Sequence, residues 1–405
     1  MKYLLIFMFL SCGNFLSSLH GKFQDDRSIA GAGDQVTFFT GNKEGKTWLY
    51  IINLKGEIRD VTEVPYNLEV SSIAYFNKNF YVGLYDIDGK NGELYKLVGS
   101  TLILVKNINT SGSSNPKYLT VYKDGLFFSA SNGSNGRELW KMYSNQNIVE
   151  VKDLNGGSVG SDPSQLTVAG EILYFSASTT IHGNELFYHD GTNTLVVEDN
   201  VLAGRDTFPK FLSVLGDDLY FSGITDGQGR SNYRAHLYKV SDKILSKVDT
   251  ADLDIKFLKS HNGTLYGSCR EGSSGTELCH VQFNQLRMIS DIFEGSSSSK
   301  PSYIEVFNYK LYFSAYTEEA GYELWSFDLS TREKALVKDL NSGTESSYPK
   351  SIYSFGDYLY FSANDGQSGH ELWRVDKKGT LELAKDIFPG KGSSYPNFSK
   401  GFYHL

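Results

Sequence analysis

Apolar and polar positions follow a repeating order along this chain. In one stretch, short apolar strands are predicted over residues 118–122, 126–130, 138–142 and 148–152. The turn Lys123-Asp124-Gly125 separates the first two strands, and Gly125 is expected to supply a positive φ there. A Gly/Ser stretch that ends in Pro163 follows the fourth strand. Short strands with turn signals every 8–12 residues or so are typical of all-β proteins.

The same order recurs with a period of roughly 46 residues, marked by a Glu-Leu-aromatic phrase at the start of each third strand. The Glu position of that phrase is filled by Trp48, Glu93, Glu138, Glu185, His236, Glu277, Glu323 and Glu371. Four-stranded units of this length are typical of β-propeller blades. The pattern predicts a single propeller of about eight blades. A count of seven blades is the alternative, if the degenerate first unit shares a blade with the C-terminal piece.

Strand composition supports radially packed blades. Tyr174 and Phe175 are neighbours, so they point to opposite faces of a sheet that is apolar on both faces and must be covered on both. The C-terminal stretch 395–405 resembles the first two strands of a further, truncated unit. It predicts that a terminal strand closes the ring by pairing with the blade at the other end of the chain.

These units resemble the ELWxxDGT repeat, which is found in secreted and surface proteins of bacteria and some animals. The fullest match runs from Leu359 to Gly366 and from Gly369 to Trp373, then through Lys385–Gly390 and Ser393–Pro396. The resemblance covers nearly the whole mature chain and implies propeller-like repeats, but no activity. The chain departs from the pattern after Trp373, where residues 376–380 only approximate the DGT segment, and further in units one, five and six.

The N-terminus predicts export. Lys2 precedes an apolar run over residues 3–10, which is followed by small residues, as in a secretory signal peptide. That run is too short for a transmembrane helix, and no other segment could span a membrane. We expect residues 1–21 to be removed and residues 22–405 to form the propeller. An alternative is a lipoprotein signal, with Cys12 as the lipidated residue on the cell surface, although Phe9 fits that signal poorly.

The remaining cysteines, Cys269 and Cys279, align with the second and third strands of unit six. They should therefore lie roughly opposite each other across a hairpin. A cross-strand disulfide fits a secreted protein, and two buried free thiols in a reducing compartment are the alternative. Glycosylation sequons, which matter only in a eukaryotic host, occur at Asn109, Asn132, Asn262 and Asn397.

Charge and aromatic content narrow the partners. A net charge of −8 without a basic block argues against nucleic acid or an anionic membrane surface. The 27 Tyr and 26 Phe residues are mostly assigned to the blade core rather than to a sugar-stacking surface. Exposed aromatic side chains would have to come from loops, where the candidates are Tyr233, Tyr316, Tyr322 and Tyr348.

The repeated carboxylates are interpreted as structural. Catalysis needs one asymmetric constellation, whereas the Glu of the phrase recurs in most units and is expected to accept hydrogen bonds from loop amides. A recurring Asp before each Gly/Ser turn is expected to cap that turn, at Asp153, Asp291, Asp339 and Asp386. Asp86 and Asp88 stand in a Gly-rich loop that could hold a structural calcium ion. No other cofactor is expected.

The repeat breaks most in unit five. Its loop carries Arg230, Tyr233 and Arg234, and His236 replaces the usual Glu. Arg270 stands on the equivalent loop of unit six. Clustered Arg and Tyr can hold an anionic or sugar ligand, and ordinary loop drift is the alternative. No nucleophile elbow, phosphate loop or His-rich metal spacing is recognisable.

Two functions follow from these features. The first is a secreted, non-enzymatic propeller for extracellular binding or a matrix role, with a protein or glycan ligand. The second is a secreted polysaccharide hydrolase or lyase with its site in the propeller channel. Non-repeating acids and arginines at one end of the channel would favour the enzyme. A quinone-dependent dehydrogenase is a remote third hypothesis, supported by blade number alone.

Overall fold

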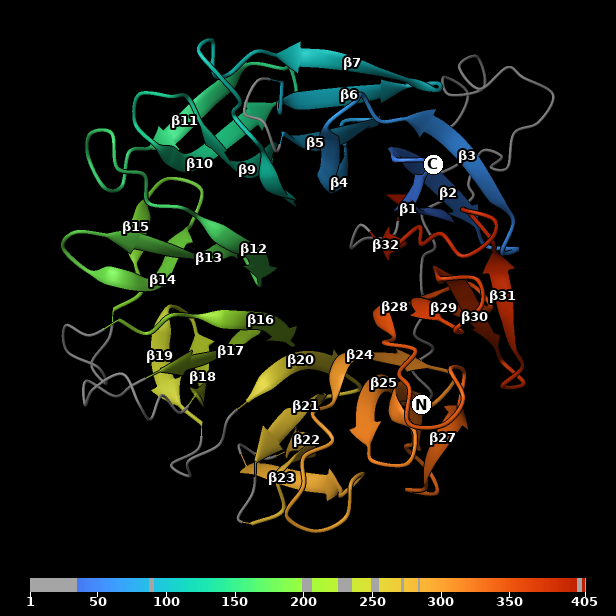
Figure 1. Cartoon of the computed structure of the whole chain (residues 1–405). Helices are drawn as coiled ribbons and strands as arrows, with labels where there is room; N and C mark the ends of the chain where they lie inside the picture. The colour runs from blue at the N-terminus through green and yellow to red at the C-terminus, as the bar shows by residue number, and fades with distance from the viewer. Residues whose placement is uncertain are drawn as a thin grey trace, which may run out of the picture.

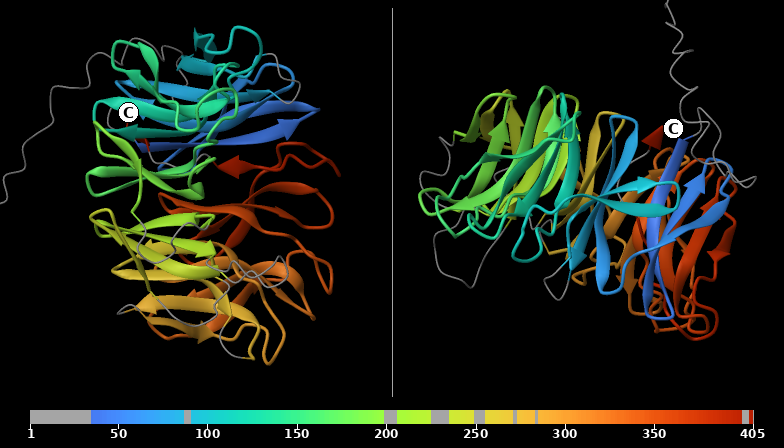
Figure 2. Two further views of the ribbon diagram at one scale, coloured as in Figure 1. Left: turned by 90° about the vertical axis from the view of Figure 1, so that its left-hand side faces the viewer. Right: turned by 90° about the horizontal axis from the view of Figure 1, so that it is seen from above.

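A computed structural model describes residues 35–86, 91–198, 206–224, 235–248, 255–270, 273–282, 285–398 and 403–404. These residues form strands and turns without helices, in eight antiparallel sheets. The sheets are arranged radially around a central axis (Figure 1), and the views from the side show a disc that is thinner along the axis (Figure 2). The predicted eight-bladed β-propeller is confirmed. Within the described part of the chain, no helix is long and apolar enough to cross a membrane.

The first four blades follow the chain in order. Blade 1 contains β1 (Gln35–Lys43), β2 (Lys46–Asn53) and β3 (Ile58–Glu63), and blade 2 contains β4 (Leu68–Phe76), β5 (Asn79–Asp86), β6 (Leu94–Val98) and β7 (Thr101–Lys106). Blade 3 contains β8 (Lys117–Tyr122), β9 (Gly125–Ser131), β10 (Arg137–Tyr143) and β11 (Ile148–Lys152). Blade 4 contains β12 (Ser164–Ala169), β13 (Ile172–Thr179), β14 (Gly183–His189) and β15 (Thr194–Val196).

The other four blades repeat this order. Blade 5 contains β16 (Lys210–Leu215), β17 (Asp218–Ile224), β18 (Ala235–Ser241) and β19 (Ile244–Lys247), and blade 6 contains β20 (Lys256–His261), β21 (Thr264–Arg270), β22 (Thr276–Gln282) and β23 (Gln285–Ser290). Blade 7 contains β24 (Ser302–Phe307), β25 (Lys310–Thr317), β26 (Gly321–Asp328) and β27 (Lys334–Lys338). Blade 8 contains β28 (Lys350–Phe355), β29 (Tyr358–Asn364), β30 (His370–Asp376) and β31 (Leu381–Lys385).

The C-terminal strands close the ring. Both β32 (Asn397–Phe398) and β33 (Tyr403–His404) pair with β1, so they fill the innermost place of blade 1. The predicted closure is confirmed. The C-terminal piece forms two short strands, but they do not pair with each other as the first two strands of a blade do, because both lie along one edge of β1. The first unit does share its blade with the C-terminal piece. The ring still has eight blades, since that unit supplies only three strands.

The apolar core lies between blades. It is divided into eight clusters, each shared by two neighbouring blades. Tyr174 packs in the cluster between blades 4 and 5, and Phe175 packs in the cluster between blades 3 and 4. The prediction that both faces of a blade are covered is therefore confirmed, and burial of apolar surface between blades holds the ring together.

Two local predictions need correction. The turn before β9 takes its positive φ at Lys123 (49°), while Gly125 already belongs to the strand, where a Cβ would clash with the side chain of Lys141. The two cysteines lie diagonally rather than opposite each other, because the register pairs Cys269 with Glu277. Their Cα atoms are 5.8 Å apart and the sulfurs lie within bonding distance, so the predicted cross-strand pair fits the structure.

Antiparallel pairing gives the disc two different faces. One face carries the tight turns between the first and second strands and between the third and fourth strands of each blade; we call it the turn face. The other carries the hairpin loops between the second and third strands and the connections from each blade to the next; we call it the loop face.

Candidate ligand-binding face

Six buried glutamates tie down the connections on the loop face. Glu323 accepts hydrogen bonds from the backbone N–H groups of Leu340 (3.2 Å) and Ser347 (2.8 Å) and from the Ser347 hydroxyl (2.5 Å). The same arrangement, with a Ser or Thr of the following connection, recurs at Glu93, Glu138, Glu185, Glu277 and Glu371. We call it the glutamate clamp. The predicted structural role of these residues is confirmed.

Burial sets the electrostatics of the clamp. It raises the pKa of four of the carboxyl groups, while the hydroxyl and backbone N–H donors that point at each carboxylate act in the opposite direction; the four are Glu138, Glu277, Glu323 and Glu371. A buried carboxylate that already accepts several hydrogen bonds is stabilised in place. Each clamp carboxylate is therefore occupied in holding its connection.

Blades 1 and 5 lack the clamp and show why it exists. They carry Trp48 and the buried His236 at the corresponding position. They are also followed by short connections, residues 64–67 and 248–255, whereas the connection after blade 7 spans residues 339–349 and those after the other clamped blades are of similar length. The clamp thus accompanies the long connections, whose backbone needs hydrogen-bond partners outside the regular sheet.

Each clamp also fixes one variable residue. The clamped Ser or Thr is followed by a residue that differs between blades and then by Pro. These presented residues are Asn115, Asp162, Phe208, Lys300, Tyr348 and Tyr395, and their φ values lie between 44° and 50°. A positive φ is costly for bulky residues, and such strain is concentrated at functional sites in proteins. The clamp supplies hydrogen bonds that offset this strain.

The repeat pattern alone does not reveal the presented residues. They can be found in the sequence as the middle residue of a Ser/Thr-x-Pro triplet. The Ser or Thr of this triplet follows each clamp Glu by 21 to 24 positions. The residue before a proline normally favours an extended conformation, so the positive φ could not be inferred from the triplet.

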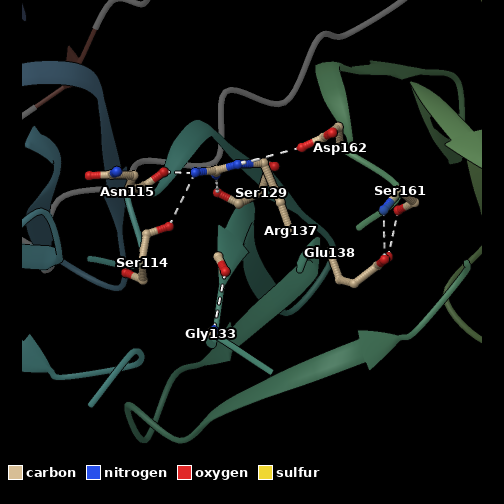
Figure 3. Close-up of polar contacts among 9 residues, drawn as sticks. Ser114, Asn115, Ser129, Gly133, Arg137, Glu138, Ser161 and Asp162 are labelled. Carbon is tan, nitrogen blue, oxygen red and sulfur yellow. Dashed lines mark hydrogen bonds and ion pairs between the residues drawn. The ribbon is translucent and has the colours of Figure 1, made fainter. Parts of the chain in front are cut away.

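The presented residues of blades 2 and 3 lie in a polar sector (Figure 3). Arg137, which precedes the clamp residue Glu138, donates to the carbonyl oxygens of Asn115 (2.8 Å) and Ser129 (3.0 Å). Its Nε lies 3.9 Å from the carboxylate of Asp162. This sector is held together by charge and hydrogen bonds, and its guanidinium is largely occupied by the protein itself.

The presented residues of blades 7 and 8 form an aromatic sector. Tyr348 stacks on Tyr322 with ring centroids 5.7 Å apart, and Tyr395 stacks on His370 at 5.0 Å. Tyr322 and His370 precede their clamp glutamates, as Arg137 does in blade 3. Tyr348 is 48% exposed and Tyr395 is 62% exposed, so each pair offers an open ring face backed by a second ring.

Three of the four aromatics predicted to be exposed on loops meet in this sector, but only Tyr348 is an exposed loop residue. The prediction is wrong for Tyr316 and Tyr322, which are half-buried in β25 and β26 because those strands pair them with each other. Tyr316 lies 5.2 Å from Tyr322, and Phe293 lies 5.9 Å from Tyr316, so a row of contacting rings runs back from Tyr348 across blade 7. The fourth candidate, Tyr233, lies outside the described residues. Tyr395 and His370 are not among the predicted candidates.

The arginine cluster predicted around unit five stays a prediction. Arg230, Tyr233 and Arg234 lie outside the described residues. His236 is only 4% exposed, while Arg270 is exposed at the loop-face end of β21.

The calcium prediction also stays open. Asp86 is buried and accepts a hydrogen bond from the backbone N–H of Asn91 at 2.6 Å, and Asp88 lies outside the described residues. Among the residues that the structure describes, no group of three or more His, Cys, Asp or Glu side chains could hold a metal ion. Farther along the chain, Asp153, Asp291 and Asp339 cap their Gly turns as expected, with N–H to carboxylate distances of 2.7, 3.2 and 2.9 Å.

The four sequons differ in accessibility. Asn109 is 8% exposed, and its side-chain nitrogen donates to the carbonyl oxygen of Ser113 at 3.2 Å, which leaves a glycan no room there in the folded chain. Asn262 and Asn397 are exposed, and Asn132 is half-buried.

An ion pair joins two of the innermost strands. Lys259 of β20 forms an ion pair of 2.8 Å with Glu305 of β24, and the Ser354 hydroxyl of β28 donates to the same carboxylate at 3.1 Å. This network does not repeat around the ring. The network contains one carboxylate, Glu305, whose charge is neutralised by Lys259. It is therefore an ion pair rather than a cluster of acidic residues.

The turn face holds a cavity of about 630 Å³. It is lined by the turns of blades 6, 7 and 8, including Asn262, Tyr309 and Lys377. Tyr309 is 72% exposed, so both faces of the disc carry open tyrosines. The stacked pairs of equivalent position, however, lie on the loop face.

No protein-family model and no curated protein matches the chain. Among solved structures it is similar to a prolyl endopeptidase, with 13% identity and a TM-score of 0.53 over 83% of this chain and 51% of that one. It is also similar to the dihydro-heme d1 dehydrogenase NirN, with 12% identity and a TM-score of 0.53 over 91% of this chain and 75% of the other. A Mycobacterium tuberculosis puromycin-hydrolyzing peptidase gives 10% identity and a TM-score of 0.50 over 81% and 58%. The chain thus spans about half the length of the peptidases, and these likenesses show the fold alone.

Proposed function

We propose that this chain is a secreted, non-enzymatic propeller whose loop face binds an extracellular protein or glycan. One observation carries the proposal. Six glutamate clamps of constant chemistry hold six presented residues of five types in the same strained conformation: one Asn, one Asp, one Lys, one Phe and two Tyr. A constant framework with variable positions on one face is how repeat proteins build binding surfaces. The predicted signal peptide and the cysteine pair support export.

The enzyme alternative finds less support. Glycoside hydrolysis commonly uses two carboxyl groups about 5 to 9.5 Å apart, flanking the scissile bond. On the described innermost strands, Glu305 is already paired with Lys259 and Ser354. The clamp glutamates are buried and repeat around the ring. A release of new reducing ends from any bound polysaccharide would revive the hydrolase hypothesis.

A comparison of the two faces tests the proposal. The chain from Lys22 onward is applied to a glycan array and to a cell-surface pull-down, as wild type and as variants of each face. Tyr348→Asn/Tyr395→Asn alters the loop face, Arg230→Ala/Arg234→Ala alters the divergent segment that the sequence marks as a candidate site, and Tyr309→Asn alters the turn face. Loss of binding in either of the first two variants, with Tyr309→Asn unchanged, supports the proposal. Full binding by both of them, or no ligand in either assay, contradicts it.

A further inference from the structure

We infer that the aromatic sector is a two-subsite binding surface for a neutral glycan chain, with one sugar ring stacked on Tyr348 and another on Tyr395. This inference rests on the proposed function and names the ligand class of one part of the loop face.

The stacked pairs are built as rigid platforms. Each exposed Tyr lies against a second ring, at interplanar angles of 24° for Tyr322–Tyr348 and 26° for His370–Tyr395. Each backbone is also fixed by its clamp, since the hydroxyls of Ser347 and Ser394 donate to Glu323 and Glu371. A ring that is already immobilised loses little conformational entropy when a ligand covers it, which favours binding.

The chemistry of the open ring faces favours sugars. The C–H face of a pyranose is apolar and flat enough to cover a tyrosine ring, while its hydroxyls need polar partners nearby. Asn397 lies two residues beyond Tyr395 and is exposed, and the Ser351 hydroxyl donates to its side-chain oxygen at 2.9 Å. Polar groups therefore follow closely on the Tyr395 platform.

The rings of the platforms favour an uncharged chain. Three of the four are tyrosines, and burial and the nearby Lys350 lower the pKa of the fourth ring, His370, which disfavours its charged form. The polar sector differs, because Asp162 and Arg137 place charges at the same structural positions in blade 3.

Repetition favours a polymer over a folded protein. The two platforms occupy equivalent positions in neighbouring blades, so an eightfold ring relates them by a turn of about 45°. Two equivalent subsites suit a ligand that presents the same ring repeatedly, as an oligosaccharide does. A globular protein surface has no such repeat.

The test measures affinity against chain length. Calorimetric titrations use β-1,4-linked glucose, xylose, mannose and N-acetylglucosamine oligomers of two to eight units with the chain from Lys22. Variants are Tyr348→Asn, Tyr395→Asn and the double variant. Asn is already the presented residue of blade 2, where Asn115 has a φ of 47°, so the substitution suits the backbone. The control is Tyr309→Asn, which removes an exposed tyrosine with a φ of 62° from the turn face.

For at least one oligomer series, we expect affinity to rise with length until both platforms are covered. Each single variant should weaken long chains about tenfold and leave short chains bound at the other platform, and the double variant should abolish binding. The control should bind as wild type. Absence of binding by every oligomer, or binding that the double variant retains, overturns the inference. If a cell-surface protein binds instead and the double variant loses it, the glycan inference fails and the proposed function stands.

Discussion

The turn face and the loop face of this propeller differ in how far their carboxylates reach along the chain. On the turn face, an Asp accepts hydrogen bonds from backbone N–H groups two to four residues away, and these bonds lower its pKa, as at Asp190, Asp328 and Asp376. The loop face has local Asp caps as well, but there a buried Glu also reaches a Ser or Thr 21 to 24 residues further along the chain, in the connection to the next blade.

The difference shows where this fold can vary. A turn that caps itself needs nothing from its neighbours and presents little that is new. A clamped connection is anchored at its ends, so the residue beside the anchor is free to change between blades. The polar pair at Asp162 and the aromatic pair at Tyr348 are two outcomes of one framework.

Removing a clamp should give the largest loss of stability. Glu323→Ala leaves the N–H groups of Leu340 and Ser347 and a buried hydroxyl without their acceptor, and we expect a loss of about 2–4 kcal/mol in the free energy of unfolding. Urea denaturation measures it. Glu345→Ala, an exposed Glu in the same connection, is the matched control and should stay within about 0.5 kcal/mol of wild type.

Giving blade 5 a clamp residue should sharpen the comparison. No Ser/Thr-x-Pro triplet follows His236 at the spacing of 21 to 24 positions found in the clamped blades. A carboxylate buried at this position without those donors is disfavoured, so we expect His236→Glu to lose about 1–2 kcal/mol of stability. His182→Glu, at an exposed loop-face histidine, is the control. A more stable His236→Glu variant would show that the clamp works without a long connection.

Changing a presented residue should cost little stability. Asn tolerates a positive φ better than Tyr does, so Tyr348→Asn should relieve strain while it loses the contact with Tyr322. We expect its free energy of unfolding to stay within about 1 kcal/mol of wild type. A thermal melt of the variant used in the binding tests gives this value. A loss as large as that of Glu323→Ala would mean that Tyr348 is part of the core.

The smallest expected effect is on the pH dependence of stability. Lowering the pH should change the contributions of Glu323 on the loop face and Asp328 on the turn face in opposite directions. The pKa of Glu323 is raised by burial, so the pH-dependent part of its contribution to stability is present below its unfolded-state pKa of about 4.3 and is lost as pH rises through the folded-state value. The pKa of Asp328 is lowered by hydrogen bonds from the Thr331 and Ser330 backbone, so its contribution is present above about 3.9 and is lost as pH falls.

The two conservative variants separate these effects. The stability difference between wild type and Glu323→Gln should shrink as pH rises from about 4 to 7, and that between wild type and Asp328→Asn should shrink as pH falls from about 5 to 2.5. Urea denaturation across this series gives both slopes. Slopes of the same sign for both variants would contradict the contrast between the faces.

The sequence predicts the framework better than the surface. The repeat predicts the burial of Tyr174 and Phe175 on opposite faces and the structural role of the recurring Glu, because most blades have the same packing and hydrogen-bonding needs. The positive φ at Tyr348 cannot be predicted from the sequence, because a residue before proline normally favours an extended backbone. The stacking of Tyr395 on His370 joins β30 to the connection after blade 8, and neighbouring residues in the sequence do not show that contact.

Register explains the remaining differences. The pairing of β32 and β33 with one edge of β1 follows from the ring's need for a single innermost strand, which a truncated repeat does not reveal. Cys269 and Cys279 are diagonal because the hairpin pairs Cys269 with Glu277, a shift that alignment by repeat does not resolve.

Hydrogen exchange with mass spectrometry tests most directly whether recognition belongs to the loop face. The chain from Lys22 is compared free and saturated with the tightest ligand from the array or pull-down. We predict that protection rises in the connections 339–349 and 386–396 and leaves the turns around Asn262, Tyr309 and Gly356 unchanged. Protection confined to those turns, with unchanged exchange in the connections, would contradict the account.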